Sequence, residues 1–291
     1  MKSAFLVLLG LMFIACSNSF SGFSLPQDKS FLYGVASGTN YEDAKKSAIN
    51  DLASNIDLTL KSNQNFLSDT KNGITTDKQA QNINLSTEIN NLSNIEVDKV
   101  KNLKLNGQKE VFIRVRLSRL SLEKQLNEKV ASYKEKALAL NTSCGVKLKD
   151  KDIFNSLAKK ALTTNLTLES LNLNTTNNLS TLANLYKLNL KKPNYAFDTK
   201  VDSNSPNFKI ILALQSELAN FVTFVPTLNA QKTIEVSIDT NYIDVSFYCD
   251  KEGTKTLLDS IRLDLNKPIN KLDDFDIVRL KARLYKDLVQ D

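Results

Sequence analysis

The segment from Glu110 to Leu117 alternates between apolar and polar side chains more regularly than any other part of the chain. An alternation with a period of two residues predicts a β-strand that buries one of its faces. Asn106-Gly107 stands just before this strand and is a strong signal for a two-residue hairpin turn. Residues 100–105 supply the first arm of that hairpin, so the sequence predicts an antiparallel sheet in this region.

A strand, a helix and a second strand are predicted near the start of the globular part. Residues 31–38 are mostly apolar and end in glycine, and residues 39–42 fit a capping box. Apolar residues then recur at helical spacing and predict a helix over 40–53. On its inner face, Ala44 and Ala48 are small enough to let the helix lie close on a sheet. Alternation follows and predicts a strand that contains Ile56, Leu58 and Leu60.

The rest of the chain predicts further helices and a second group of strands. An amphipathic helix runs from Leu122 to Leu140, and an Asn/Thr-rich section over 172–178 separates two looser helical patterns. Residues 208–214 fit either a strand or a helix, and a closing helix starts at about Asp273. Strand candidates are 233–238, 242–248 and 257–265. The predicted fold class is α+β. We expect an α+β domain with an antiparallel sheet and packed helices over residues 30–140. A helical segment over 141–199 and a second small α+β domain over 200–291 should follow it.

The first sixteen residues predict export and attachment to a membrane. Residues 4–15 form an apolar run that is too short for a membrane span, which needs about 20 residues, so 1–15 is predicted to be a signal peptide. The ending Phe13-Ile14-Ala15-Cys16 resembles the lipobox of bacterial lipoproteins, which implies cleavage between Ala15 and Cys16 and acylation of Cys16. An ordinary secretory signal with a chance cysteine is the alternative.

In the lipoprotein pattern, Cys16 would carry two or three acyl chains, and Ser17 behind it implies the outer membrane. One acyl chain gives only marginal membrane binding, so several chains would make the attachment effectively permanent. Residues 16–29 are small, polar and rich in turn formers, and they are predicted to be a lipidated tether. The expected partners are the membrane, through the acyl chains, and other envelope proteins, with the domains facing the periplasm or the cell surface.

Composition excludes several classes of activity. The chain contains no His, which rules out Ser-His-Asp and Cys-His nucleophilic sites as well as His-ligated zinc. None of its eight glycines forms a GxGxxG or P-loop motif, so a phosphate cradle is not expected. The formal net charge of +6 comes from interspersed charges in an exported protein, so nucleic acid is not an expected partner. No cofactor and no metal site is predicted.

Cys144 and Cys249 remain once Cys16 is assigned to the lipid. An even pair in an oxidising compartment predicts a disulfide. A bridge that closes a loop of about 100 residues contributes at most about 4.7 kcal/mol in the chain-entropy model. Two buried free thiols are the alternative.

Two short motifs suggest chemistry, but ordinary structure explains them better. Glu169-Ser170 has the Glu-Ser context of lytic transglycosylases, yet no glycine for their substrate loop occurs between Gly145 and Gly253, so a surface glutamate is favoured. A second motif contains Asp239, Asn241 and Asp244 and could suggest a calcium site. It lacks the spacing and the glycine of a calcium-binding EF-hand loop, so a turn between two strands is the favoured explanation.

A candidate docking face lies on the strand that ends at Leu117. Phe112, Arg114 and Arg116 project from the face opposite its apolar residues, and Arg119 follows at the strand end. The three arginines are half of the six in the chain. Such a set could bind an anionic polymer or the acidic groups of a partner protein, and the alternative is a solvated sheet face.

The predicted strand, helix and following segment combine a Tyr-Gly-x-x-x-Gly strand, an alanine-rich helix and an Asn-Ile pair. These features are carried by Tyr33, Gly34, Gly38, Ala44, Ala48, Leu52, Ala53 and Ile56. On these residues, the region from Phe31 to Leu140 resembles the LPP-twenty family of outer-membrane lipoproteins. The family motif is structural and implies no catalytic residues. Related domains occur in envelope and flagellum-associated lipoproteins, which implies a similar setting for this chain.

Together the patterns predict a non-enzymatic outer-membrane lipoprotein with a structural, assembly or interaction role in the cell envelope, for which a flagellum-associated structure is one concrete form. A binding module for an envelope glycan or lipid is the alternative, and a deep apolar cavity between the two domains would favour it. A hydrolase that uses only carboxylates is the least favoured, because no pattern singles out the two acids that it would need.

Overall fold

The computed structural model describes residue 26 and residues 28–67, 94–105, 108–251 and 253–289. The predicted signal peptide, Ala15 and Cys16 lie outside these residues. No helix in the described ranges combines the length and the apolar character that a membrane crossing requires. The chain divides into two compact units. The first unit contains Met1–Lys129 and Thr163–Asn177, and the second contains Val130–Leu162 and Asn178–Asp291.

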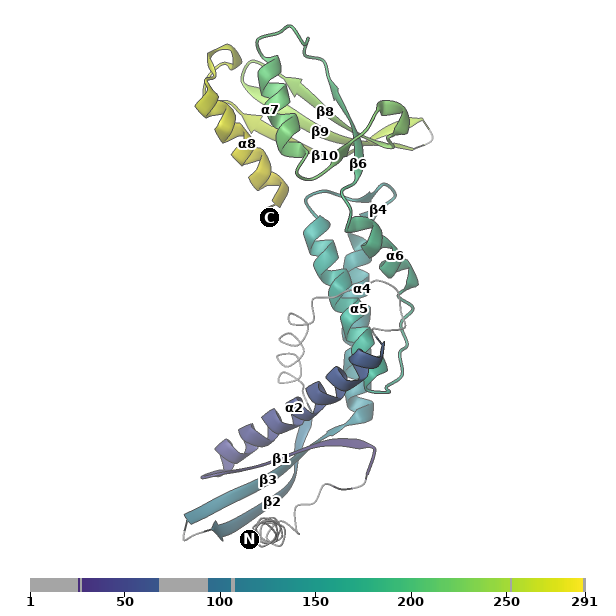
Figure 1. The fold of residues 1–291 in the computed structure, drawn as a ribbon, viewed down its shortest axis with the longest axis vertical. Helices are drawn as coiled ribbons and strands as arrows, with labels where there is room; N and C mark the ends of the chain where they lie inside the picture. Colours follow the sequence, from purple (N-terminus) through teal and green to yellow (C-terminus); the bar gives the residue numbers. More distant parts are fainter. Residues whose placement is uncertain (1–25, 27, 68–93, 106–107, 252, 290–291) are drawn as a thin grey trace, which may run out of the picture. The chain divides into compact units, whose positions relative to one another are not determined.

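The sheet of the first unit is antiparallel, with the order β1-β3-β2. Its strands are β1 (Phe31–Gly38), β2 (Ile95–Leu105) and β3 (Gln108–Ser118). Leu105 pairs with Gln108, so β2 and β3 form the hairpin that the sequence predicts, although its turn at 106–107 lies outside the described residues. Helix α2 (Tyr41–Leu67) covers one face of this sheet (Figure 1).

Small residues bring α2 unusually close to β1. Ala44 and Ala48 are fully buried on the inner face of the helix, as the sequence predicts. A Cβ atom added to Gly34 would lie 2.6 Å from the backbone nitrogen of Leu52, and one added to Gly38 would lie 2.6 Å from that of Ala44. No side chain fits at either glycine without moving the helix, so the close contact requires glycine in the strand.

The strand predicted around Ile56 is wrong, because α2 continues through this segment to Leu67. Ile56 lies four residues after Leu52, and both side chains are buried on the same helical face. Leu58 is exposed. A short apolar alternation is also compatible with a helix when its buried members fall at helical spacing, and here packing on the sheet favours the helix.

Helices α4 (Arg119–Ala139) and α5 (Lys151–Ser170) follow the first sheet along the chain, joined by the two-stranded hairpin of β4 (Asn141–Thr142) and β5 (Gly145–Val146). The divisions between the two compact units fall within these helices, after Lys129 and after Leu162. The predicted boundaries at 140 and 199 therefore differ from the compact units, because long helices contribute side chains to more than one core. Helix α6 (Ser180–Asn189) belongs to the second unit.

The second unit contains a mixed sheet with the order β10-β9-β8-β6-β7. Strand β6 (Asn194–Thr199) runs parallel to both β7 (Thr223–Phe224) and β8 (Lys232–Ile238), whereas β8, β9 (Tyr242–Lys251) and β10 (Thr254–Asp264) are successively antiparallel. The sequence predicts β8, β9 and β10 but not β6. The short 3-10 helices η1 (Thr227–Asn229) and η2 (Ile269–Lys271) lie in connections.

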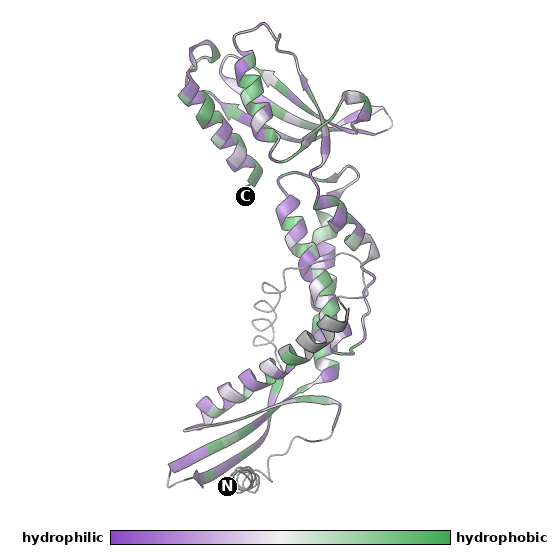
Figure 2. Ribbon diagram, in the orientation of Figure 1, coloured by the Kyte–Doolittle hydropathy of each residue, from purple (hydrophilic) through white to green (hydrophobic). Residues whose placement is uncertain are grey.

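Two helices, α7 (Phe208–Leu218) and α8 (Asp274–Val289), pack side by side against this sheet (Figure 1). Residues 208–214 are therefore helical, which settles the ambiguity of their pattern. Apolar residues run along α7 and the strands beside it (Figure 2), and they form one core. The α+β class predicted from the sequence is confirmed.

Candidate functional site

Helix α8 carries two apolar stripes, and only one of them is buried. Leu280, Leu284 and Leu288 face the core of the second unit and are buried. The second stripe is exposed and contains Phe275, Val278, Ala282, Tyr285 and Val289. Successive members are separated by three, four, three and four residues, which is the spacing of the a and d positions of a coiled coil. We call this second set the α8 seam.

All five residues of the seam are exposed to solvent. Phe275 is 62% exposed and Val278 is 61% exposed. At 3.6 residues per turn, the five positions fall within an arc of about 80°. Contiguous apolar surface of this kind marks interaction sites more often than isolated exposed residues do.

A capping box fixes the start of α8. The backbone N–H of Asp276 donates to a carboxylate oxygen of Asp273 at 3.0 Å, and the N–H of Asp273 donates to Asp276 at 3.2 Å. Lys267 approaches both carboxylates, at 3.4 Å and 2.9 Å. The hydrogen bond from Asp276, together with Lys267, lowers the pKa of Asp273 below its usual value. The first turn of the helix, which carries Phe275, is thereby held in place.

Contacts with α7 lie along one side of α8. Lys209 pairs with Asp274 at 3.5 Å, and Lys281 pairs with Glu217 at 3.4 Å. The ring of Phe221, just beyond α7, lies 5.6 Å from the ring of Tyr285. With its leucines buried and these pairs on the α7 side, α8 presents the seam outward.

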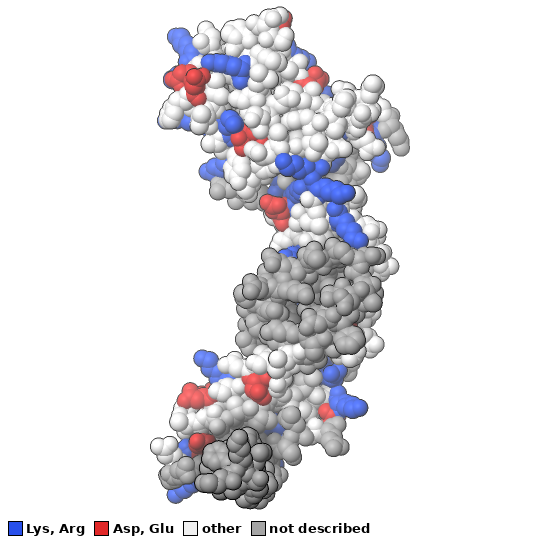
Figure 3. Space-filling view, viewed as in Figure 1, with Lys and Arg blue, Asp and Glu red and all other residues white. Residues whose placement is uncertain are grey.

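Basic side chains border the seam on the side away from α7. Arg279, Arg283 and Lys286 are exposed there. The guanidinium of Arg279 lies 4.2 Å from the ring centroid of Phe275, and Arg283 donates to the backbone carbonyl of Asp264. We call these three residues the basic rim. On the face that Figure 3 draws, positive and negative side chains lie side by side in the upper part of the second unit.

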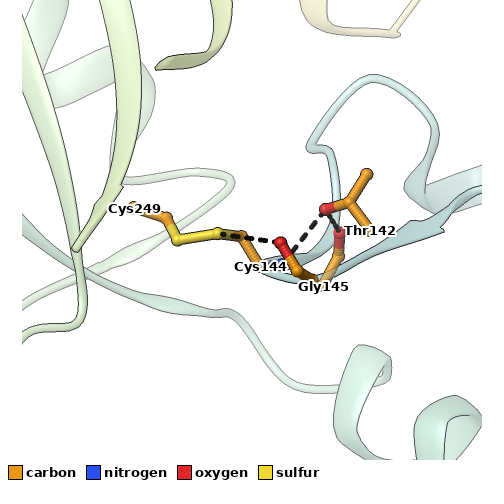
Figure 4. Close-up of a disulfide and its surroundings, with 5 residues drawn as sticks. Thr142, Cys144, Gly145 and Cys249 are labelled. Atoms are coloured by element: carbon orange, nitrogen blue, oxygen red, sulfur yellow. Dashed lines mark hydrogen bonds between the residues drawn. A yellow bond between two sulfur atoms is a disulfide. The ribbon is translucent and has the colours of Figure 1, made fainter. Parts of the chain in front are cut away.

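The structure joins Cys144 and Cys249 in a disulfide, with their Cα atoms 6.1 Å apart. The bridge connects the β4–β5 hairpin to β9 within the second unit (Figure 4). Gly145 adopts a φ of +89°, and the Thr142 hydroxyl donates to its carbonyl at 2.7 Å. The glycine therefore allows the tight turn that presents Cys144 to the sheet.

Tyr195 and Lys232 are two titratable residues near this bridge, and Lys232 lies opposite Cys249 in the sheet. Burial raises the pKa of Tyr195 and lowers that of Lys232, whose ammonium lies 5.7 Å from the Tyr195 ring. A neighbouring cavity of about 10 Å³ has room for about one water molecule. Lys149 and Asp259 form an ion pair at 3.2 Å beside it. This cavity is too small for a glycan or a lipid.

On the predicted docking face, the two arginines of β3 pair with acidic residues of β2. Arg114 pairs with Asp98 at 2.5 Å, and Arg116 pairs with Glu96 at 2.9 Å. A bulge between Val97 and Lys99 shifts the register of β2 at Asp98, whose carboxylate also lies 3.5 Å from Arg116. The hydrogen bond with Glu96 raises the pKa of Arg116. The strand next to β3 therefore neutralises the two arginines.

The other two members of that predicted face also have different roles. Phe112 is only 5% exposed. Arg119 donates to the backbone carbonyl of Leu171 at 3.0 Å, so it fastens the end of α5 to the start of α4 within the first unit. A strand pattern shows which residues share a face but not which neighbours occupy it, and binding of a partner at this face stays a prediction.

The Asn/Thr-rich section after α5 is bound to α4 by a network that the sequence analysis missed. The buried Asn127 side chain donates to the carbonyl of Asn174 at 2.9 Å and accepts from the backbone N–H of Thr176 at 3.0 Å. Glu123 accepts from the backbone N–H of Asn174, also at 3.0 Å. The polar residues of this section therefore replace the backbone partners that a helix would supply.

Neither short motif gathers into a site. Glu169 accepts a hydrogen bond from Asn165 one turn earlier, and Asp244 pairs with Arg262 at 2.8 Å. Asp239 accepts from the backbone N–H of Thr240 in the turn between β8 and β9. Within the described part of the chain, no group of three or more acidic or cysteine side chains is arranged to hold a metal ion.

No protein-family model and no curated protein matches the sequence. Among solved structures, the chain is similar to the crystal structure of the secreted protein HP1454 from the human pathogen Helicobacter pylori. The two share 20% sequence identity with a TM-score of 0.53, over 90% of this chain and 97% of that chain. At this identity the likeness establishes a shared fold.

Proposed function

We propose that this protein is a non-enzymatic lipoprotein of the bacterial outer membrane, anchored through acyl chains on Cys16, with a structural or assembly role in the cell envelope. The observation that carries this proposal is the α8 seam, an apolar line with coiled-coil spacing on a helix whose other apolar stripe is already buried. Exposed apolar surface costs solubility, and a protein-binding role gives a reason for keeping it.

Two further observations support an envelope setting. The N-terminal sixteen residues have the pattern of a lipoprotein signal, and the chain has the fold of a protein described as secreted. The disulfide between Cys144 and Cys249 suits an oxidising compartment. A flagellum-associated envelope structure is one concrete form of the proposal, and it rests on the resemblance to the LPP-twenty family.

Affinity purification of the acylated protein from envelopes, with the Val278→Glu variant beside the wild type, tests the interaction role. We expect the wild type to recover envelope proteins that the variant loses. Leu228→Glu is the matched control, because Leu228 is 99% exposed in η1 and does not belong to the seam. Recovery of the same proteins, or of none, with both wild type and Val278→Glu would contradict the proposal.

The anchor is tested separately with a Cys16→Ala variant and a lipid label. We expect the wild type to take up label and to sediment with membranes, and the variant to do neither. If the wild type remains unlabelled while the variant sediments with membranes equally well, Cys16 is not a lipidation site.

A further inference from the structure

We propose that the α8 seam binds an amphipathic α-helix of another protein, and that this partner helix carries acidic residues along the flank that meets the basic rim. The inference deepens the proposed function, on which it rests, by naming the chemistry of the partner. It follows from the spacing of the seam, from its width and from the charge of its border.

The spacing selects a helix as the occupant. From Phe275 to Val289 the seam extends about 21 Å at 1.5 Å per residue, which corresponds to two heptads. Apolar residues separated by alternate steps of three and four form knobs that fit the holes of a second helix crossing at about 20°. Ala282 stands at the centre of the seam, where its small side chain lets a partner helix come close.

The width of the seam argues against a lipid surface. Helices that lie in a membrane interface bury a broad apolar face, whereas a stripe restricted to a and d positions is narrower and typical of helix pairing. Here Lys281 and Asp274 border the seam on one side, and both are ion-paired to α7. The basic rim borders it on the other side, so charged groups lie close to both edges.

The charge of the rim selects an acidic partner and disfavours a second copy of this chain. Arg279, Arg283 and Lys286 all carry the same sign. An antiparallel copy would set one basic rim against another. A parallel copy would set Lys286 opposite Lys281 but also Arg279 opposite Asp274, so its one repulsive and one attractive flanking pair give it no net gain from charge. An acidic flank on another protein avoids both repulsions and pairs with the rim.

The test uses the full chain and two synthetic peptides of three heptads, each labelled with a fluorophore. Both carry Leu at the a and d positions; one has Glu and the other has Lys at the flanking e and g positions. We expect the Glu peptide to bind the wild type at least about tenfold more tightly than the Lys peptide, because a few flanking ion pairs together contribute that factor. Fluorescence anisotropy measures both affinities.

Variants separate the seam from the rim. Val278→Glu should weaken binding of the Glu peptide by more than about tenfold, since it places a carboxylate in the apolar contact. Leu228→Glu should leave binding unchanged. The double variant Arg279→Glu/Lys286→Glu should reverse the preference and bind the Lys peptide more tightly, which a merely destabilised helix could not do.

Each of the following outcomes would overturn the inference. Equal binding of the two peptides would show that the basic rim does not select the partner. Peptide binding that Val278→Glu leaves unchanged would show that the seam is not the binding surface. Sedimentation of the wild type as a dimer that Val278→Glu dissociates would make a second copy the occupant. Binding to phosphatidylglycerol vesicles that depends on Val278, without peptide binding, would make a lipid surface the occupant.

The outcomes also separate this inference from the proposed function. If envelope proteins are recovered in a Val278-dependent manner while neither peptide binds, the interaction role stands and the acidic-helix chemistry fails. If the Glu peptide binds with the expected preference but no envelope protein is recovered, the seam binds helices and the proposed envelope role fails.

Discussion

Helices α2 and α8 both cover a sheet with one amphipathic face, but they do so with different residues. In the first unit, the buried Ala44 and Ala48 of α2 lie against Gly34 and Gly38 of β1. In the second unit, α8 packs through leucines, of which Leu284 is fully buried. Small residues bring a helix and a strand close together and leave no room for variation, whereas large residues fill a wider space between layers.

The outer faces of the two helices differ as well. The outward positions at the start of α2 include the exposed Glu42, Asp43 and Lys46, so this helix is a solvated cover for its sheet. The outward face of α8 keeps the apolar seam instead. Among the described residues, the start of α2 therefore presents charge to solvent, whereas α8 presents an exposed apolar stripe.

The largest expected effect comes from the disulfide, which belongs to the second unit alone. Reduction of the bridge should lower the free energy of unfolding of that unit by up to about 4.7 kcal/mol, because the bridge closes a loop with a sequence separation of 105 residues. Thermal unfolding with and without reductant measures the shift. The Cys144→Ser/Cys249→Ser variant is the control and should not respond to reductant. An unchanged wild-type transition would mean that the bridge does not stabilise the unit.

A smaller but substantial effect is expected at the contact between α2 and β1. Gly34→Ala should lower the free energy of unfolding of the first unit by about 1–3 kcal/mol, because the new methyl group would meet the backbone of α2. Urea denaturation measures it. Ser37→Ala, at an exposed position of the same strand, should change stability by less than about 0.5 kcal/mol. Equal effects of the two substitutions would disprove the close contact.

Acid should loosen the first turn of α8. The pKa of Asp273 is lowered in the folded protein, so its contribution is present at neutral pH and is lost as the pH falls through that lowered pKa. Hydrogen-exchange protection of residues 274–278 should therefore fall in acid. Asp273→Asn retains an acceptor for the cap but removes this titration, and its protection should depend less on pH. Identical pH profiles for both proteins would contradict the assignment.

The smallest effect is expected from Val278→Glu on the stability of the free chain. Because Val278 is exposed, its substitution should change the free energy of unfolding by less than about 0.5 kcal/mol while it weakens partner binding. Leu280→Glu, two residues away, buries a carboxylate and should destabilise the second unit severely. A large destabilisation by Val278→Glu would mean that the chain itself covers the seam.

Much of the fold follows from local patterns. The β2–β3 hairpin, the helices from 119 to 170 and the strands β8 to β10 follow from turn chemistry and periodicity. Strand β6 was missed because its six residues contain too little alternation to identify. The segment around Ile56 was assigned to a strand because a short alternating run fits two periods, and only packing against β1 and β3 distinguishes them.

The polar sites depended more strongly on tertiary structure. Asn127 and its partner Asn174 in the Asn/Thr-rich section after α5 are separated by 47 residues along the sequence. No local pattern in either segment predicts that they pair. Similarly, Arg114 and Arg116 form a basic face in the sequence pattern but are neutralised by the strand beside them. A hydrogen bond or an ion pair forms only between groups that lie next to each other, and the tertiary fold determines which groups do.

The sequence by itself determined the apolar positions of α8, including the three-four spacing of the seam. It also determined the even cysteine pair and the absence of His. Only the tertiary structure decided which apolar stripe of α8 is buried, because both stripes fit a helix equally well. The leucines fill the space above the sheet, and their burial leaves Phe275 and Val278 facing solvent.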